Sequence, residues 1–153
     1  MSYSIATLLT RNLQDVFGEN DPGRRRAAID EIFTEDCVFY EPSGHVYHGR
    51  DEIDRVAGSI RATHADYQYQ PIGEPEELGN AGRIRWVEGR IGEQPAIAGT
   101  DFIIARDGRI AAVTSFSISC PETDSVSRPG TDPIFRTGLE RIFGNSSTPM
   151  TEQ

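Results

Sequence analysis

Two acidic residues, Glu41 and Asp101, stand where the sequence predicts that a carboxyl group is kept away from bulk water. Glu41 follows the apolar run at 37–40 and precedes a proline, which favours an extended backbone, so its side chain should leave the end of a strand. Asp101 shares one face of a predicted strand with Ile97 and Ile103. A carboxyl group on an apolar face must be paired, hydrogen-bonded or protonated, and such groups serve as general acids and bases.

Histidines, arginines and cysteines suggest other kinds of site. His45 and His48 are three residues apart, but the Gly-rich segment around them offers no further ligand, so we predict loop histidines and no metal site. The three arginines at 24–26 fall at the start of a predicted helix, where such a run is typical of a solvated face. Cys37 and Cys120 are too few and too differently placed for a disulfide framework, and we interpret both as reduced thiols.

Three helices are predicted to position the acidic residues. Residues 3–17 carry apolar side chains at spacings of three and four, and Gly18 ends this segment. Asp21 is expected to cap a second helix, with a proline at its first position. A third helix begins after Gly49, and its apolar stripe consists of Ile53, Val56, Ala57 and Ile60.

Strands account for most of the remaining pattern. We expect one strand to end at Tyr40 and others at 66–72, 83–91, 97–106 and 109–118. The dipeptide at 107–108, Asp-Gly, joins the last two as a two-residue hairpin. In that register Asp101 lies opposite Thr114, and Gly99 lies opposite Phe116.

The preceding hairpin extends the face that carries Asp101. Its expected register places Trp86 opposite Asp101 and Glu88 opposite Gly99. The other face of the sheet is also apolar, and we expect a second copy of the chain to cover it in a homodimer. This second face is predicted to carry Phe102, Ile104 and Val113.

Length and composition limit the class of protein. A chain of 153 residues with 37% hydrophobic content builds one core. A net charge of −9, from 24 acidic and 15 basic residues, disfavours binding to nucleic acid and to anionic membrane surfaces. Because no apolar run approaches the about 20 residues of a membrane span and no signal-peptide pattern is present, we expect a cytoplasmic protein. A domain at 1–120 should precede a Pro/Ser-rich tail at 121–153 with a short helix at 133–143.

The order of elements and two motifs resemble a known superfamily. A helical pair precedes the strand that ends in Glu41-Pro42, the next helix starts with a Tyr-x-Gly-x-x-x-Ile motif at 47–53, and the last hairpin reads GTDFIIARDGRI at 99–110. Together these resemble the nuclear transport factor 2-like superfamily over about residues 3–119, which includes ketosteroid isomerases and SnoaL-like polyketide cyclases. The resemblance implies an α+β fold: a cone-shaped, curved antiparallel sheet wrapped around three N-terminal helices, with an apolar pocket and dimerisation through the sheet.

Within the superfamily, the positions of the two acids resemble those of ketosteroid isomerase. This implies that Glu41 removes a proton next to a carbonyl group and that Asp101 stabilises the resulting oxyanion, without a cofactor, on a small apolar carbonyl compound. The isomerases also have a first-helix tyrosine donor, whereas this chain has Leu13 and Phe17 there, so Tyr47 is the expected substitute. Polyketide cyclases of this fold place an acid about where Ser115 lies, and a serine cannot replace it as a base.

A non-catalytic domain of the same fold, which binds a small ligand or dimerises, is the alternative to an enzyme of isomerase or cyclase type. In either case the predicted apolar pocket holds a small ligand and is lined by residues of the helices and of one sheet face. These residues are Leu13, Phe17, Tyr40, Tyr47, Val56, Ile60, Trp86, Glu88, Ile103, Thr114 and Phe116.

Overall fold

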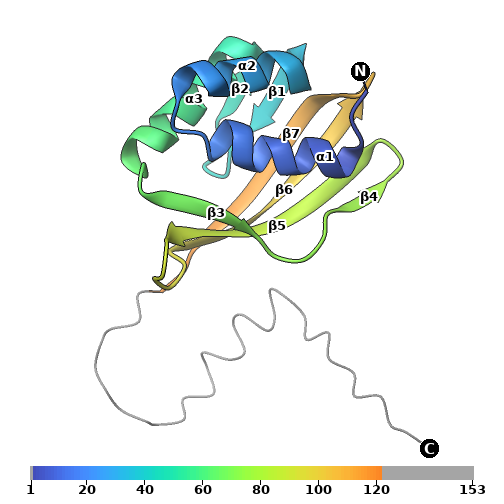
Figure 1. Ribbon diagram of the computed structural model, residues 1–153. Coiled ribbons are helices and arrows are strands. Elements are labelled where there is room, and N and C mark those ends of the chain that lie inside the picture. The colour runs from blue at the N-terminus through green and yellow to red at the C-terminus, as the bar shows by residue number, and fades with distance from the viewer. Residues whose placement is uncertain (1, 122–153) are drawn as a thin grey trace, which may run out of the picture. The chain divides into compact units, whose positions relative to one another are not determined.

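Helices pack against one face of a curved sheet in the computed structural model, which describes residues 2–121 (Figure 1). Helix α1 (Ile5–Arg11) continues directly into the π-helical segment η1 (Asn12–Phe17). Helix α2 (Pro22–Ile32) and helix α3 (Gly49–Thr63) complete the three predicted helices. The predicted helix at 133–143 lies outside the described residues.

Local capping explains where the first two helices begin. The side chain of Ser4 accepts a hydrogen bond from the backbone N–H of Thr7, and that of Asp21 accepts one from the N–H of Arg24. These bonds satisfy backbone donors that have no partner within the helix. The N-cap predicted at Asp21, followed by proline, is therefore confirmed.

Seven strands form one sheet within residues 2–121. They are β1 (Phe33–Tyr40), β2 (Val46–His48), β3 (Tyr67–Pro71), β4 (Glu76–Leu78), β5 (Ala81–Arg90), β6 (Ile97–Arg106) and β7 (Arg109–Ser119). The order is β2-β1-β7-β6-β5-β3, with β4 also paired to β5. Strands β1 and β7 run parallel, so the sheet is mixed and not wholly antiparallel as expected, and the short strands β2 and β4 were not predicted.

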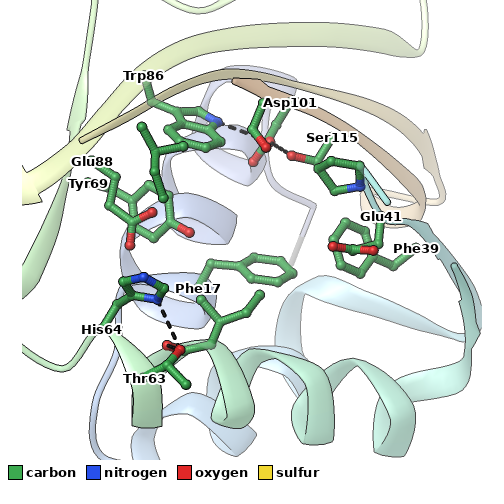
Figure 2. Close-up of a pocket in the computed structure, with 14 residues that line it drawn as sticks. Phe17, Phe39, Glu41, Thr63, His64, Tyr69, Trp86, Glu88, Asp101 and Ser115 are labelled. Atoms are coloured by element: carbon green, nitrogen blue, oxygen red, sulfur yellow. Dashed lines mark hydrogen bonds between the residues drawn. The ribbon is translucent and has the colours of Figure 1, made fainter. Parts of the chain in front are cut away.

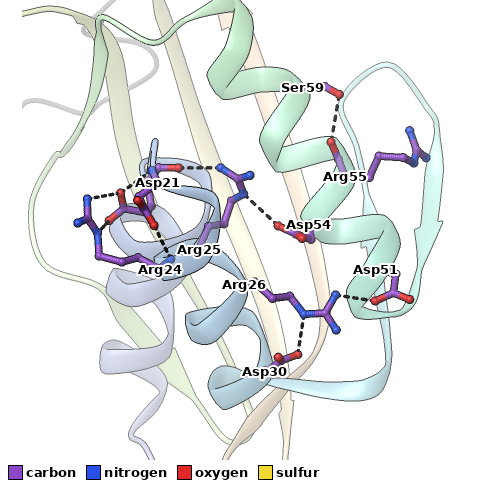
Figure 3. Close-up of polar contacts among 10 residues, drawn as sticks. Asp21, Arg24, Arg25, Arg26, Asp30, Asp51, Asp54, Arg55 and Ser59 are labelled. Carbon is purple, nitrogen blue, oxygen red and sulfur yellow. Dashed lines mark hydrogen bonds and ion pairs between the residues drawn. The ribbon is translucent and has the colours of Figure 1, made fainter.

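The arginine run at 24–26 joins α2 to α3 and does not form a free basic patch (Figure 3). Nε of Arg25 donates to Oδ1 of Asp54 on α3 at 3.0 Å, and the Arg25 side chain is largely buried between the two helices. Arg26 pairs with Asp30 on its own helix at 3.0 Å, and its Nη1 donates to Oδ1 of Asp51 on α3 at 2.5 Å. The pairs with Asp54 and Asp51 join α2 to α3, and α3 forms one wall of the pocket described below.

The register between β6 and β7 differs from the prediction because of a β-bulge. Pairing next to the turn is as expected, but the register shifts between Ile104 and Ala105. An extra residue on β7 sends each later side chain to the opposite face. Asp101 therefore lies opposite Ser115 and not Thr114. As a result Val113, expected on the outer face, is in the core with 1% of its surface exposed.

The register between β5 and β6 is also shifted, but by two residues. Trp86 lies opposite Gly99 and Ile84 lies opposite Asp101. Because side chains alternate with a period of two, this shift leaves every residue on its predicted face. Trp86, Glu88 and Asp101 therefore do share the inner face of the sheet, all buried.

The outer face of the sheet carries apolar side chains that no element of residues 2–121 covers. Phe102 and Phe116 meet edge to face, with ring centroids 6.0 Å apart. They remain 39% and 61% exposed, and Ile104 and Ile118 beside them are about as exposed. The helices all cover the other face (Figure 1). We propose that a second copy of the chain packs on this surface, as a patch of this kind on a small domain favours association.

We expect Phe116→Glu to convert a dimer into a monomer, because a charge would be buried at the centre of the apolar contact. Sedimentation velocity at micromolar concentration measures the change. Ile91→Glu is the matched control, because Ile91 is 77% exposed but lies in the turn after β5. A wild type that is monomeric under these conditions would remove the proposal.

Candidate active site

A cavity of about 180 Å³ lies between the helices and the inner face of the sheet (Figure 2). Its walls combine aromatic rings with three carboxyl groups, so it is an apolar pocket with a few polar side chains. Its lining residues are Phe17, Phe39, Glu41, Pro42, Ile60, Thr63, His64, Tyr69, Trp86, Glu88, Ile97, Asp101, Ser115 and Ser117.

Asp101 on β6 is a buried acid of this pocket, with 4% of its surface exposed. Its Oδ1 accepts two hydrogen bonds, from Nε1 of Trp86 at 3.0 Å and from Oγ of Ser115 at 2.7 Å. Burial raises the pKa of Asp101, and the bonds from Ser115 and Trp86 oppose part of that rise. The net effect favours the neutral acid beyond the usual pH range of an aspartate.

Asn12 is the partner of the other oxygen of Asp101. It begins the segment η1 and is wholly buried, and its Nδ2 lies 3.4 Å from Oδ2 of Asp101. The Oδ1 of Asn12 has no hydrogen-bond partner among the described residues. An amide can present either its N–H or its C=O, so Asn12 suits both an ionised and a neutral Asp101. Sequence analysis missed this residue because a single asparagine in an amphipathic helix carries no local signal.

Gly99 allows Trp86 to reach Asp101. A Cβ atom at residue 99 would lie 2.3 Å from Cζ2 of the Trp86 ring and 2.6 Å from the carbonyl oxygen of Phe116. The indole therefore occupies the space that the side chain of any other residue at position 99 would fill. This close approach directs the Trp86 N–H along the strand to Asp101.

Glu41 lies at the mouth of the pocket, directly after β1. Its side chain is 24% exposed, and it accepts hydrogen bonds from the hydroxyl and, at 3.2 Å, from the backbone N–H of Ser43. The turn is closed by the N–H of Glu41, which donates to the carbonyl of His45 at 2.9 Å. Glu41 directly follows the end of β1, as predicted. The carboxylate thus has a defined position while part of it remains accessible.

A second polar group occupies another end of the pocket, where Figure 2 shows Glu88, Tyr69 and His64 close together and away from Ser115. Burial raises the pKa of Glu88, whereas His64, Arg61 and a hydrogen bond with Tyr69 lower it. The pKa of the Tyr69 phenol is raised, mainly by burial and then by the nearby Glu88 and Asp101. The Tyr69 ring also meets Trp86 edge to face, with centroids 4.9 Å apart.

Part of the predicted pocket list falls on the cavity wall and part does not. The residues that line it are Phe17, Glu41, Ile60, Trp86, Glu88 and Asp101. Leu13, Val56 and Ile103 are instead packed in the core, because their helix or strand positions face other side chains.

Four further predicted lining residues point elsewhere. Tyr40 is 46% exposed, and the bulge in β7 turns Thr114 and Phe116 to the outer face. Tyr47 stacks on Phe39 from outside the cavity, with ring centroids 6.0 Å apart, so it is not the substitute donor that we expected. Tyr69 is the tyrosine whose ring lines the pocket.

Neither a metal cluster nor a membrane span is found in the described part of the chain. Residues 2–121 hold no group of three or more His, Cys, Asp or Glu side chains placed to bind a metal ion. None of their helices has both the length and the apolar character needed to cross a membrane.

Comparison with known proteins identifies relatives of this chain. The model of the SnoaL-like domain family matches residues 11–113. No protein of curated function matches the sequence. Among solved structures, a SnoaL-like family protein from Agrobacterium tumefaciens has a TM-score of 0.69 at 23% identity, over 74% of this chain and 97% of its own.

Two more solved structures share the fold. An NTF2-like protein of unknown function from Mesorhizobium loti has a TM-score of 0.57 at 22% identity, over 77% of this chain and 97% of its own. A protein with a ketosteroid isomerase-like fold from Catenulispora acidiphila, in complex with trimethylamine, has a TM-score of 0.59 at 16% identity, over 74% and 86%. At these identities the likeness shows the fold alone, and the α+β cone fold expected from the sequence is confirmed.

Replacing Asp101 by Asn should change the pH dependence of stability. An aspartate in the unfolded chain ionises near pH 3.9, about its usual pKa, whereas burial raises the pKa of Asp101 in the folded state. The contribution of Asp101 to stability is therefore complete below about pH 3.9 and is lost as the pH rises through the folded pKa. Relative to wild type, the free energy of unfolding of Asp101→Asn should increase between about pH 4 and pH 7.

Chemical denaturation at several pH values measures this difference. Asp107→Asn, in the exposed turn between β6 and β7, reports the effect of removing one negative charge from the chain. A wild type and Asp101→Asn that differ by the same free energy at every pH would contradict the assignment of a raised pKa.

Gly99→Ala should displace the Trp86 ring, because the added methyl group would overlap it. We expect a loss of about 1–3 kcal/mol in stability, the usual range for overpacking. The emission of Trp86, the single tryptophan of the chain, should change with it. In a Trp86→Leu background the same substitution should cost less, and an equal cost would show that the ring is not the obstacle.

Proposed function

This chain belongs to the SnoaL-like domain family, and we propose that it is a cofactor-independent enzyme of isomerase or cyclase type. Its substrate in this proposal is a small, mostly apolar carbonyl compound that binds in the pocket between the helices and the sheet. Glu41 acts as the general base, and Asp101 acts as the donor that stabilises the enolate oxygen. The family fold supports this choice without deciding it, because one fold hosts many activities.

The arrangement of hydrogen bonds at Asp101 carries the proposal. Both strong donors, Trp86 and Ser115, are directed at Oδ1, and Oδ2 has the more distant Asn12 amide at 3.4 Å. In a neutral carboxylic acid the carbonyl oxygen accepts and the hydroxyl donates, so this pattern suits Oδ1 as the carbonyl oxygen and Oδ2 as the hydroxyl. Burial favours the same neutral form. Asp101 lines the cavity, and in the proposed reaction its protonated Oδ2 donates to the developing oxyanion.

Glu41 has the properties that a base requires. It lines the same cavity as Asp101, its position is set by Ser43, and part of its surface remains accessible. In the proposed step its carboxylate takes a proton from the carbon next to the carbonyl group, and the electron pair of that C–H bond moves onto the carbonyl oxygen as an enolate. The proton then returns to another carbon, or the enolate carbon attacks a second carbonyl group of the same molecule. Neither route needs a redox partner.

Cavity size and charge limit the substrate. A volume of about 180 Å³ is slightly larger than an apolar cavity of about 150 Å³ that holds benzene, so one ring with small substituents fits. Three carboxyl groups line the pocket, namely those of Glu41, Glu88 and Asp101. The carboxylate of Glu41 repels anions, and we therefore propose a neutral compound of one ring with small substituents.

One observation favours a non-catalytic ligand-binding domain as the second candidate. The carboxyl group of Asp101 already has three hydrogen-bond partners within the protein: Asn12, Trp86 and Ser115. In that case Asp101 would serve to hold these side chains together in the core, and the pocket would bind its ligand without reaction. The following experiment distinguishes the two.

We expect wild-type protein to catalyse hydrogen–deuterium exchange next to the carbonyl group of at least one member of a panel of small cyclic ketones and enones. Glu41→Gln should abolish this exchange, because an amide is not a base, while ligand binding is nearly unchanged. Asp101→Asn should keep part of the activity because an amide still donates. Asp101→Leu should lose about 100-fold or more, the usual scale for one oxyanion donor. Exchange is followed by NMR.

Glu35→Gln is the matched control for Glu41→Gln, since Glu35 is an exposed residue on the same strand, β1. A wild type that is silent across the whole panel, together with Asp101 variants that are less stable by about 1–3 kcal/mol through unpaired partners, would favour the ligand-binding domain.

A further inference from the structure

The turn after β1 brings a serine and a histidine to the side chain of Glu41. Two backbone bonds close this turn: the N–H of Glu41 donates to the carbonyl of His45, and the N–H of Gly44 donates to the carbonyl of Glu41, both at 2.9 Å. Oγ of Ser43 contacts Oε2 of Glu41 and, at 2.7 Å, Nδ1 of His45. Nδ1 and Oε2 are themselves 3.7 Å apart, too far for a direct hydrogen bond, so the hydroxyl bridges them.

Ser43 cannot donate in both of these contacts, because a hydroxyl group has one proton. If Ser43 donates to Oε2 of Glu41, then Nδ1 of His45 must carry a proton and donate it to Oγ. If Ser43 instead donates to Nδ1, then the carboxyl group of Glu41 must carry a proton and donate it to Oγ. The two arrangements use the same heavy atoms and differ only in the positions of two protons.

The ring of His45 is held in place although it faces solvent. It stacks on Tyr47 with ring centroids 6.3 Å apart, and Tyr47 is fixed in turn by the ring of Phe39 at 6.0 Å and by the guanidinium of Arg55 at 5.6 Å. The His45 side chain is 73% exposed, whereas Glu41 is 24% exposed and lines the cavity. The hydrogen-bonded chain therefore leads from the pocket to bulk water.

We propose that Ser43 and His45 form a proton relay between Glu41 and solvent. Once Glu41 has taken a proton, its carboxyl group donates to Oγ of Ser43, and Ser43 donates to Nδ1 of the neutral imidazole. Transfer of both protons toward His45 leaves a carboxylate and an imidazolium, with the total charge unchanged. The exposed hydroxyl and ring N–H groups exchange with water, and transfer back delivers a solvent proton to Glu41. Ser43 and His45 act only through Glu41, as positioning residues.

A role for Ser43 in fixing the turn alone does not account for the histidine. The hydroxyl and the backbone N–H of Ser43 already hold the carboxylate of Glu41. The contact of Nδ1 with Oγ adds nothing to that support, but it is the contact that links an exposed, titratable ring to the carboxyl group. Histidine exchanges protons readily near neutral pH, which suits it to this position.

This inference deepens the proposed function and rests on it for the source of the proton. It supplies the route by which a proton that Glu41 removes from a substrate exchanges with water while the ligand covers the mouth of the pocket. The hydrogen-bonded chain itself needs no substrate, and this allows the two proposals to be tested separately.

NMR of the histidine ring nitrogens tests the chain without any ligand. At about pH 8, above the usual histidine pKa of about 6.5, a free imidazole is neutral and mostly carries its proton on Nε2. We expect wild-type His45 to carry it on Nδ1, because the carboxylate of Glu41 takes the proton of Ser43 and leaves Oγ as an acceptor. A wild-type His45 in the ordinary Nε2–H form would overturn the relay.

Two serine variants and a second histidine serve as comparisons in these spectra. Ser43→Ala should return His45 to the Nε2–H form, because the acceptor for Nδ1 is removed. Ser119→Ala, at an exposed serine at the end of β7, should leave His45 unchanged. His48, an exposed residue of β2, should keep the same ring signals in all three proteins. Loss of the Nδ1–H form in Ser119→Ala as well would also count against the relay.

The isomerisation of 3-cyclohexen-1-one to 2-cyclohexen-1-one in D2O tests proton transfer. In this reaction the base moves a hydrogen from C2 to C4, so C4 of the product shows whether that hydrogen exchanged on the protein. We expect wild type to place mostly solvent deuterium at C4. His45→Phe should lower the ratio of deuterium to hydrogen there by at least about 10-fold, below the roughly 10²–10⁴-fold contribution of a positioned proton-transfer group, because water at the mouth replaces part of it.

This ratio is set within each turnover, so a smaller amount of folded protein does not change it. His48→Phe is the matched control and should keep the wild-type ratio. If His45 carries Nδ1–H but wild type forms no product, the hydrogen-bonded chain stands and the catalytic proposal falls. If wild type forms product but His45→Phe keeps the wild-type ratio, catalysis stands and the relay falls, because water then reaches Glu41 directly.

Discussion

The solvation of one buried carboxyl group, that of Asp101, ties together the features that shape the pocket. A carboxyl group on the inner face of a central strand needs donors, and here they come from three separate elements. The indole of Trp86 reaches it only because Gly99 has no side chain, and Ser115 faces it only because β7 contains a bulge. Asn12 reaches it from the first helix. The sheet register, the bulge and the packing of helix on sheet are thus all coupled to the same group.

Asp101 and Glu88 line the same pocket but have different electrostatic surroundings. At Asp101 burial raises the pKa and only neutral donors approach, so the neutral acid is favoured. Burial also raises the pKa of Glu88, but there the nearby His64 and Arg61 and a hydrogen bond with Tyr69 oppose part of the rise. The two acids differ because of their neighbours and not because of their depth.

The sequence predicted the helices, the long strands and the face on which Trp86, Glu88 and Asp101 lie, since these follow from periodicity and turn residues. It could not predict the bulge in β7, because the segment around residue 111 carries no glycine or other marker of an inserted residue. That single residue moved Thr114 and Phe116 to the outer face and brought Ser115 to Asp101. The contact of Arg61 with Glu88 depends on how α3 packs on β5, and pairings of that kind leave no trace in local spacing.

The role of Ser115 in turn limits which chemistry the family fold can support here. The polyketide cyclases that the sequence resembles place an acid about where Ser115 lies. In this chain the Ser115 hydroxyl donates a hydrogen bond to Asp101 at 2.7 Å. A serine that donates in this way does not act as a base. In the proposed reaction the proton acceptor then comes from elsewhere on the cavity wall. Glu41 meets this need better than Glu88, because Glu41 is partly exposed at the mouth, whereas Glu88 is buried and held against Arg61.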